Sequence, residues 1–190
     1  MFIDNTVANR IAELDDRVAS QLDERITSDP TYIEDKSYLT KIVDSFVVKG
    51  IVRFYWNASV KREIENTKAD WKRNTTLCKV QDHTFAYYHS TAYPIIMSNE
   101  NPATYLTTEQ GLILDDLYNA LPRAYLKDIK ILADALFNPE IEFLLTTDRD
   151  HLANDRVRSK LEESGLNKYL KIRTPRELFE DLKERDITIR

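Results

Sequence analysis

Hydrophobic residues follow two alternating patterns along the chain. Short apolar runs, rich in β-branched and aromatic residues, predict buried strands at 2–3, 51–56, 141–147 and 169–172. In the segments between these runs, apolar residues recur at steps of three and four, which predicts amphipathic helices. These helical segments lie at 11–26, 38–47, 57–73, 112–121, 129–137, 151–165 and 174–186. Strands that alternate with helices are typical of an α/β fold with a mainly parallel sheet.

Capping residues define several of the expected helix ends. Thr174 as N-cap, Pro175 at the first helical position and Glu177 at the third predict the start of the last helix. Gly50 and Gly165 stand where helices are expected to end. The "SDP" stretch at 28–30 is expected to end the first helix, because proline does not continue a helix easily. No element is predicted for residues 74–106.

Composition excludes several classes of protein. A chain of 190 residues fits one domain, and 42% hydrophobic residues are enough for a core. The net charge of -5 gives no overall basic field for nucleic acid. The single cysteine excludes internal disulfides and multi-cysteine zinc sites. Three scattered glycines leave no phosphate-binding loop or dinucleotide fingerprint.

Segments that would direct the chain to a membrane are not expected. The start of the sequence has no basic stretch followed by an apolar signal-peptide core. No apolar run approaches the length that spans a bilayer. We therefore expect a cytoplasmic protein with no membrane partner.

Several acidic residues are placed where a parallel sheet would gather them. Asp4 follows the first strand and Asp148 follows the strand at 141–147. Ligand sites in open parallel sheets lie beyond the carboxyl ends of the strands. Glu63 and Asp128 lie near expected helix starts that can face the same edge. Asp150 and Asp134 are secondary candidates. Clustered carboxylates favour Mg²⁺ or Mn²⁺, and such a metal can activate water for phosphodiester hydrolysis.

The segments that carry these acids resemble the motifs of the PIN-domain (PilT N-terminus) family, a group of mostly metal-dependent ribonucleases. "FIDNTV" resembles the opening strand with its first acid, and "SVKREI" resembles the serine-to-glutamate helix motif. "LKDIKILADALF" resembles the third-acid helix, and "FLLTTDRDHL" resembles the threonine-x-aspartate strand end. "KIRTPRELFEDL" resembles the last strand and helix. The residues matched to the motifs are Asp4, Ser59, Glu63, Asp128, Thr146 and Asp148.

The resemblance implies a fold and a site. The fold would be one PIN-like domain over 1–190, a three-layer α/β/α arrangement. Its mainly parallel sheet would have about four or five strands with helices on both faces, and residues 66–110 would form an insertion-like segment. The catalytic and metal-binding acids would be Asp4, Glu63, Asp128 and Asp148, with Asp150 as an auxiliary ligand. The family order of residues after the first acid is reversed here at Asn5 and Thr6.

The resemblance also implies an activity. With Mg²⁺ or Mn²⁺, the protein would hydrolyse RNA through a metal-activated water, as an endoribonuclease. Many members are toxins of toxin–antitoxin pairs, so an antitoxin protein and a second copy of the chain are candidate partners. Basic residues that flank Asp148 in the sequence, Arg149, Arg156 and Arg158, are candidates for holding the RNA backbone.

Each acid also has an explanation without function. Asp4 could cap a helix or turn, and Glu63 could belong to a solvated charged face. Asp128 is favoured near a helix start by the macrodipole. Asp148 and Asp150 could form a turn and an N-cap. Two rivals therefore stay open. One is an inert PIN-like scaffold that binds RNA or protein. The other is an aspartate-nucleophile phosphatase, which would need a second aspartate where Thr6 stands.

Overall fold

The first apolar run of the chain becomes the central strand of a parallel sheet. The structure, a computed structural model, describes residues 1–14, 20, 24–56, 60, 96–97, 108–121 and 126–189. Five strands pair in the order β3-β2-β1-β4-β5, and every pairing is parallel. They are β1 Phe2–Ile3, β2 Tyr55–Trp56, β3 Ile96–Met97, β4 Phe143–Leu145 and β5 Lys171–Arg173. The predicted α/β fold with a parallel sheet is confirmed.

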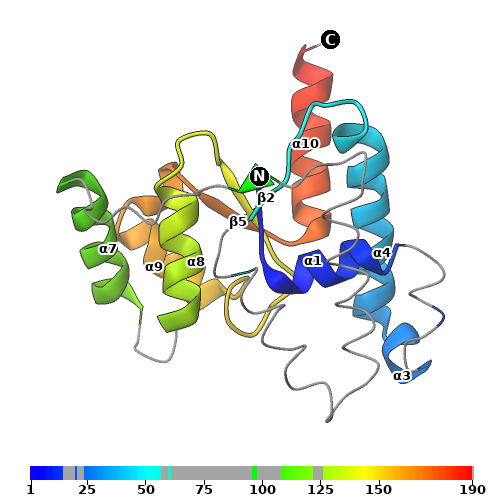
Figure 1. Ribbon diagram of the computed structural model, residues 1–190, viewed down its shortest axis with the longest axis horizontal. Helices are drawn as coiled ribbons and strands as arrows, with labels where there is room; N and C mark the ends of the chain where they lie inside the picture. Colours follow the sequence, from blue (N-terminus) through cyan, green and yellow to red (C-terminus); the bar gives the residue numbers. More distant parts are fainter. Residues whose placement is uncertain are drawn as a thin grey trace.

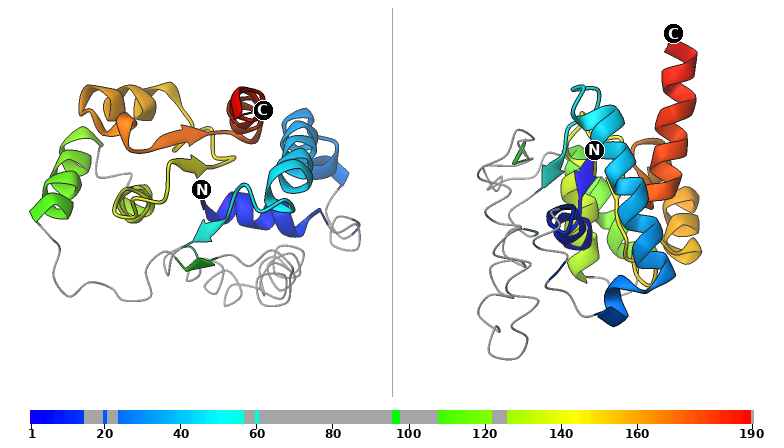
Figure 2. Two further views of the ribbon diagram at one scale, coloured as in Figure 1. Left: turned by 90° about the horizontal axis from the view of Figure 1, so that it is seen from above. Right: turned by 90° about the vertical axis from the view of Figure 1, so that its right-hand side faces the viewer.

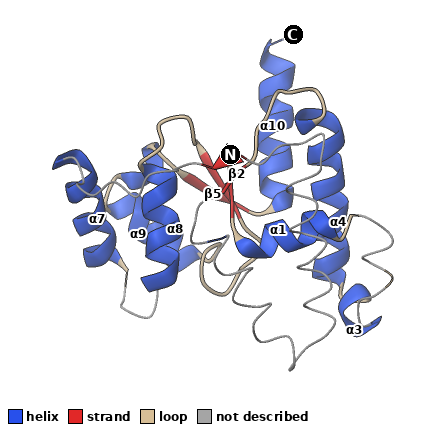
Figure 3. Cartoon of the chain, viewed as in Figure 1, coloured by secondary structure: helices blue, strands red, loops and turns tan. Residues whose placement is uncertain are grey.

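Helices lie on both sides of this sheet. Figures 1 and 2 show α1, α4 and α10 on one side and α7, α8 and α9 on the other, and Figure 3 shows the short strands between them. The described helices are α1 Asn5–Ala12, α3 Glu24–Thr27, α4 Pro30–Ile42, α7 Thr108–Ala120, α8 Leu126–Leu136, α9 Asp155–Glu163 and α10 Pro175–Ile189. Val43–Val47 continues α4 as a π-helical turn, η1, and Leu166–Lys168 forms a 3-10 turn, η3. No described helix is long and apolar enough to span a bilayer.

The two central strands are apolar because helices cover both of their faces. Phe2, Ile3, Leu144 and Leu145 have no exposed surface. Strands buried on both faces read as continuous apolar runs rather than as alternating patterns. This is why the sequence pattern identified β1 and β4 despite their shortness.

The order of the strands reverses beside β1. Phe2 of β1 lies next to Tyr55 of β2 on one side and next to Leu144 of β4 on the other. From β1 the chain builds β2 and β3 outward in one direction, and it then returns to build β4 and β5 in the other. The switch point therefore lies between β1 and β4. Ligands of open α/β sheets bind at such points, beyond the carboxyl ends of the strands.

Two predictions for strands need correction. β2 is shorter than the run 51–56, because the N–H groups of Ile51 and Val52 donate to the carbonyl of Phe46 at 2.9 and 3.2 Å. Those two donors end η1 and do not join the sheet. The second correction is β3, which lies in the stretch 74–106 where no element was predicted. The rest of that stretch lies outside the described residues.

Helix boundaries also differ from the expected ones. Of the helix expected over 11–26, the structure describes the end of α1, which begins earlier at Asn5 and ends at Ala12, and most of α3, whereas residues 15–19 and 21–23 lie outside the described residues. The "SDP" stretch follows the end of a helix, as expected, since α3 ends at Thr27, and it also begins the next helix, because Asp29 caps α4 and Pro30 occupies its first turn. Of the helix expected over 57–73, Val60 alone is described, so that prediction stays open.

Several capping predictions are confirmed. The N–H of Thr174 donates to Glu177 Oε2 at 2.8 Å, and the N–H of Glu177 points back to Thr174 Oγ1 at 3.5 Å. This reciprocal pair is a capping box at the start of α10. Gly50 and Gly165 have φ angles of 71° and 70°, in the left-handed region that glycine adopts at helix ends.

Candidate functional site

Asp4 is a buried carboxylate at the end of β1, with 3% of its surface exposed. Its Oδ1 accepts hydrogen bonds from the N–H of Val7 at 2.8 Å and from the hydroxyl of Thr6 at 2.7 Å. Its Oδ2 accepts a hydrogen bond from the hydroxyl of Thr146, a fully buried residue after β4. The expectation that Asp4 caps a helix is thus confirmed, since the Val7 contact caps α1.

Two threonines join the ends of β1 and β4 around this carboxylate. Thr6 Oγ1 also accepts a hydrogen bond from the N–H of Thr147 at 3.3 Å. Thr146 Oγ1 accepts one from the N–H of Asp148 at 2.9 Å. The reversed pair after the first acid therefore still supplies a hydroxyl beside Asp4, from Thr6.

The surroundings of Asp4 disfavour its ionised form. Burial raises the pKa of Asp4 from 3.8 to about 6; hydrogen bonds from Thr146, Val7 and Thr6 oppose this rise, and the charge of Asp148 adds to it. Asp148 is thus close enough for its charge to act on Asp4. A cation between the two carboxylates would favour ionisation of Asp4.

Asp148 holds the turn that follows β4. Its Oδ1 accepts hydrogen bonds from the N–H of Asp150 at 3.1 Å and from that of His151 at 2.9 Å. The His151 Nδ1 lies 3.2 Å from both carboxylate oxygens. The side chain of Asp148 is 26% exposed, so solvent reaches it. Asp148 is therefore a turn residue, as the explanation without function expected, and an accessible carboxylate as well.

The prediction that a helix begins near His151 is wrong. Asn154 is the N-cap of α9, since its side chain accepts a hydrogen bond from the N–H of Val157 at 2.9 Å. The carbonyl of Asp148 accepts from the N–H groups of Leu152 and Ala153, which holds this stretch as a turn. Asp150 is exposed and does not cap the helix.

The structure shows the positions of some of the other acids expected at the site. Asp128 lies in the first turn of α8 and is half-buried. Figure 1 shows α8 beginning at the same edge of the sheet where β1 leads into α1. Asp134 lies further along α8 and is half-buried. Ser59 and Glu63 lie outside the described residues. In the described part of the chain, no three His, Cys, Asp or Glu side chains form a group that could hold a metal ion.

A cleft of about 530 Å³ opens beside Asp148. Its walls come from α1, from α3, from the start of α4 and from the turn after β4. The lining residues are Arg10, Ile26, Asp29, Thr31, Tyr32, Asp35, Thr147, Asp148, Arg149 and Asp150. The cleft therefore borders the turn that follows β4, next to the switch point, and Asp4 is not among its lining residues.

Two ion pairs at this cleft were not foreseen in the sequence. Arg149 donates from Nη1 and Nη2 to the two carboxylate oxygens of Asp35, both at 2.8 Å. Arg10 Nη1 lies 2.8 Å from Oε2 of Glu13. Asp35 and Glu13 are 2% and 4% exposed. Asp35 did leave a signal, because it shares the buried face of α4 with Tyr32, Leu39 and Ile42 at steps of three and four.

Comparison with other proteins found no match for this chain among family models, curated proteins or solved structures. No family assignment follows from those comparisons. The assignment of function therefore depends on the chemistry of the site itself.

Asp4 and Asp148 have donor atoms that suit a hard divalent cation. A carboxylate oxygen can accept two hydrogen bonds, and Asp4 Oδ2 accepts from Thr146 alone among the described residues. Asp148 Oδ2 contacts His151 Nδ1 within the same described part of the chain. Mg²⁺ is typically held by one or two carboxylates together with water and substrate phosphate. The two aspartates thus fit Mg²⁺ or Mn²⁺.

Proposed function

We propose that this protein is a Mg²⁺- or Mn²⁺-dependent endoribonuclease with a PIN-like three-layer α/β/α domain. The observation that carries the proposal is the hydroxyl of Thr146 at the switch point, which donates to the buried carboxylate of Asp4 and accepts from the N–H of Asp148 and so joins the two acids. A buried carboxylate with a strongly shifted pKa, next to a second carboxylate and a cleft, is typical of a functional site.

The residues have distinct roles in this proposal. Asp4 and Asp148 hold the metal, with Asp128 and Glu63 as further catalytic acids and Asp150 as an auxiliary ligand. Thr6 and Thr146 fix the Asp4 carboxylate by hydrogen bonds, and His151 contacts Asp148. The bound metal would lower the pKa of an attacking water and stabilise charge on the scissile phosphate. No covalent intermediate with the protein is required.

A partner and a cellular setting belong to the same proposal. RNA is the proposed substrate, and the protein is proposed to act in the cytoplasm as one domain. A toxin role would add an antitoxin protein as a partner, and a homodimer is compatible with that role. The genes next to the coding sequence and the mass of the purified protein in solution test these two points.

One observation favours an inert scaffold as the second candidate. The described residues contain no group of three potential ligands, and Asp148 already holds its own turn. A scaffold of this kind would keep the cleft and bind RNA without cutting it. The phosphatase is less favoured, because Thr6 occupies the place of its second aspartate and donates a hydrogen bond to Asp4 Oδ1.

The experiment is cleavage of a mixed RNA pool in EDTA, Mg²⁺ or Mn²⁺. Wild type is compared with Asp148→Asn and with Asp44→Asn, a matched control at an exposed acid of η1. We expect metal-dependent cleavage by wild type and Asp44→Asn, with a loss of at least about a hundredfold in Asp148→Asn. No cleavage by folded wild type in either metal would favour the scaffold. Equal cleavage by Asp148→Asn would show that the site is misplaced.

A further inference from the structure

Two arginines of the cleft are each held by a buried carboxylate. Asp35 fixes the guanidinium of Arg149 through two hydrogen bonds of 2.8 Å. Glu13 contacts Arg10, whose guanidinium carbon also lies 4.2 Å from the centre of the Tyr32 ring. Long cationic side chains usually lose entropy when they bind a ligand. These two are ordered before any ligand arrives, which reduces that cost.

Arg149 keeps a second binding edge. A guanidinium has five N–H groups, and the pair with Asp35 uses one from each Nη. Nη1 also donates to the carbonyl of Thr147 at 3.4 Å. Within the described part of the chain, the Nε–H of Arg149 has no acceptor, and 36% of the side chain is exposed. That edge matches two oxygens of a phosphate group, which arginine binds as a fork.

The cleft also contains the opposite charge. Asp29, Asp148 and Asp150 line it, whereas the charge of Asp35 is balanced by its pair with Arg149. These three carboxylates, of which Asp148 contacts His151 Nδ1, would repel a bare anion but would attract a divalent cation. A phosphodiester that carries a bound divalent cation suits both charges of the cleft, because the arginines can bind its phosphate oxygens and the acids can bind the cation.

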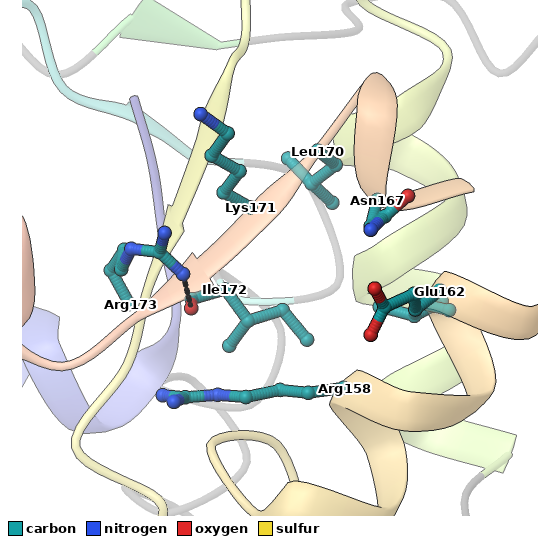
Figure 4. A pocket seen from close by; sticks show the side chains of 8 residues that line it. Arg158, Glu162, Asn167, Leu170, Lys171, Ile172 and Arg173 are labelled. Atoms are coloured by element: carbon teal, nitrogen blue, oxygen red, sulfur yellow. Dashed lines mark hydrogen bonds between the residues drawn. The ribbon is translucent and has the colours of Figure 1, made fainter. Parts of the chain in front are cut away.

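The other two arginines near Asp148 in the sequence lie elsewhere. Arg158 donates to both carboxylate oxygens of Glu177 at 2.7 and 2.6 Å. It lines a separate pocket of about 210 Å³ beside β5, as Figure 4 shows. Arg156 is exposed at the start of α9 and does not line the cleft. Of these three arginines, Arg149 alone faces the cleft.

We infer that Arg149 and Arg10 bind the phosphate backbone of an RNA strand beside Asp148, with Asp35 and Glu13 as their positioning residues. The inference rests on the proposed function for the choice of RNA as the ligand. In this inference, α1, α4 and the turn after β4 form a phosphate-binding wall. The wall aligns the RNA strand with the acidic residues of the site.

The test measures binding without cleavage. An end-labelled single-stranded RNA of mixed sequence is titrated with protein in Ca²⁺, followed by fluorescence anisotropy, and its integrity is checked on a gel. The variants are Arg149→Lys and Arg10→Lys, which keep the charge beside Asp35 and Glu13. Arg176→Lys is the matched control, because Arg176 also pairs with an acid of α4, Glu34 at 3.2 Å, outside the cleft.

We expect Arg149→Lys to bind about tenfold more weakly, because the fork to a charged phosphate is lost. The salt dependence should stay close to that of wild type, since lysine keeps the charge. Arg176→Lys should bind like wild type. If Arg149→Lys does not fold, Arg10→Lys carries the same expectation of weaker binding.

The results separate this inference from the nuclease proposal. Binding like wild type by the folded cleft variants, an equal loss in Arg176→Lys, or no RNA binding by wild type would overturn the inference. Weaker binding by Arg149→Lys, together with no cleavage by wild type in Mg²⁺ or Mn²⁺, would support the inference and refute the nuclease.

Discussion

Asp4 combines a structural role with an unfavourable charge. Its carboxylate caps α1 and joins two strand ends, yet burial raises its pKa to about 6. A carboxyl whose folded pKa lies above the unfolded value of 3.8 stabilises the fold fully below that value. This contribution is lost as the pH rises through about 6. The cost of ionisation is on the order of 3 kcal/mol, at about 1.4 kcal/mol for each pKa step.

The first prediction follows from that sign. In EDTA, Asp4→Asn should gain thermal stability relative to wild type as the pH rises from about 4 to about 6, because asparagine does not ionise. The difference in Tm should then be constant at higher pH and should amount to several degrees. The measurement is calorimetry of both proteins over this pH range. If their Tm values change with pH in the same way, the surroundings of Asp4 do not disfavour its ionised form.

Individual residues differ in how well the sequence alone places them. Asp4 and Asp148 were placed correctly at strand ends, because an apolar run that stops at an acid is visible locally. Asp35 and Arg149 are 114 positions apart, and no local pattern links them. A buried acid on an apolar helix face indicates that some partner exists, but the identity of that partner depends on how α4 packs beside the turn after β4.

At the scale of the element, the capping box of α10 was fully readable from local chemistry. Thr174 and Glu177 exchange hydrogen bonds across one helical turn, so their spacing alone predicts the contact. Helix α9 was not readable in the same way. Its start depends on the carboxylate and carbonyl of Asp148, which hold residues 150–153 in a turn. Such competition between a turn and a helix start is decided by tertiary structure.

Removal of this cap gives a second prediction. Thr174→Ala should lower the free energy of unfolding by about 1 kcal/mol, because the N–H of Glu177 loses its acceptor at the start of α10. Thr174→Ser should retain most of the stability, since its hydroxyl can replace that of threonine. Urea unfolding measures both, and equal midpoints for Thr174→Ala and wild type would contradict the role of the cap.

At the scale of the whole molecule, the topology of the sheet brings Asp4 and Asp148 close together. β1 and β4 are far apart in sequence, but they are neighbours in the sheet at the point where strand order reverses. Alternating patterns predicted a parallel sheet, but they could not give its strand order. β3, Ile96–Met97, is as short as β1, and it escaped prediction because it lies in an aromatic-rich stretch in which no regular period of apolar residues is visible.

The central claim is that Asp4 and Asp148 share one divalent cation. The direct measurement is Mn²⁺ binding followed by electron paramagnetic resonance, at a pH well above the Asp4 pKa of about 6. Wild type and Asp44→Asn should bind one Mn²⁺ per chain in the millimolar range or tighter, as weakly charged oxygen sites do. Asp4→Asn and Asp148→Asn should each lose that site while remaining folded. Equal Mn²⁺ binding by all four proteins, or none by wild type, would contradict the account.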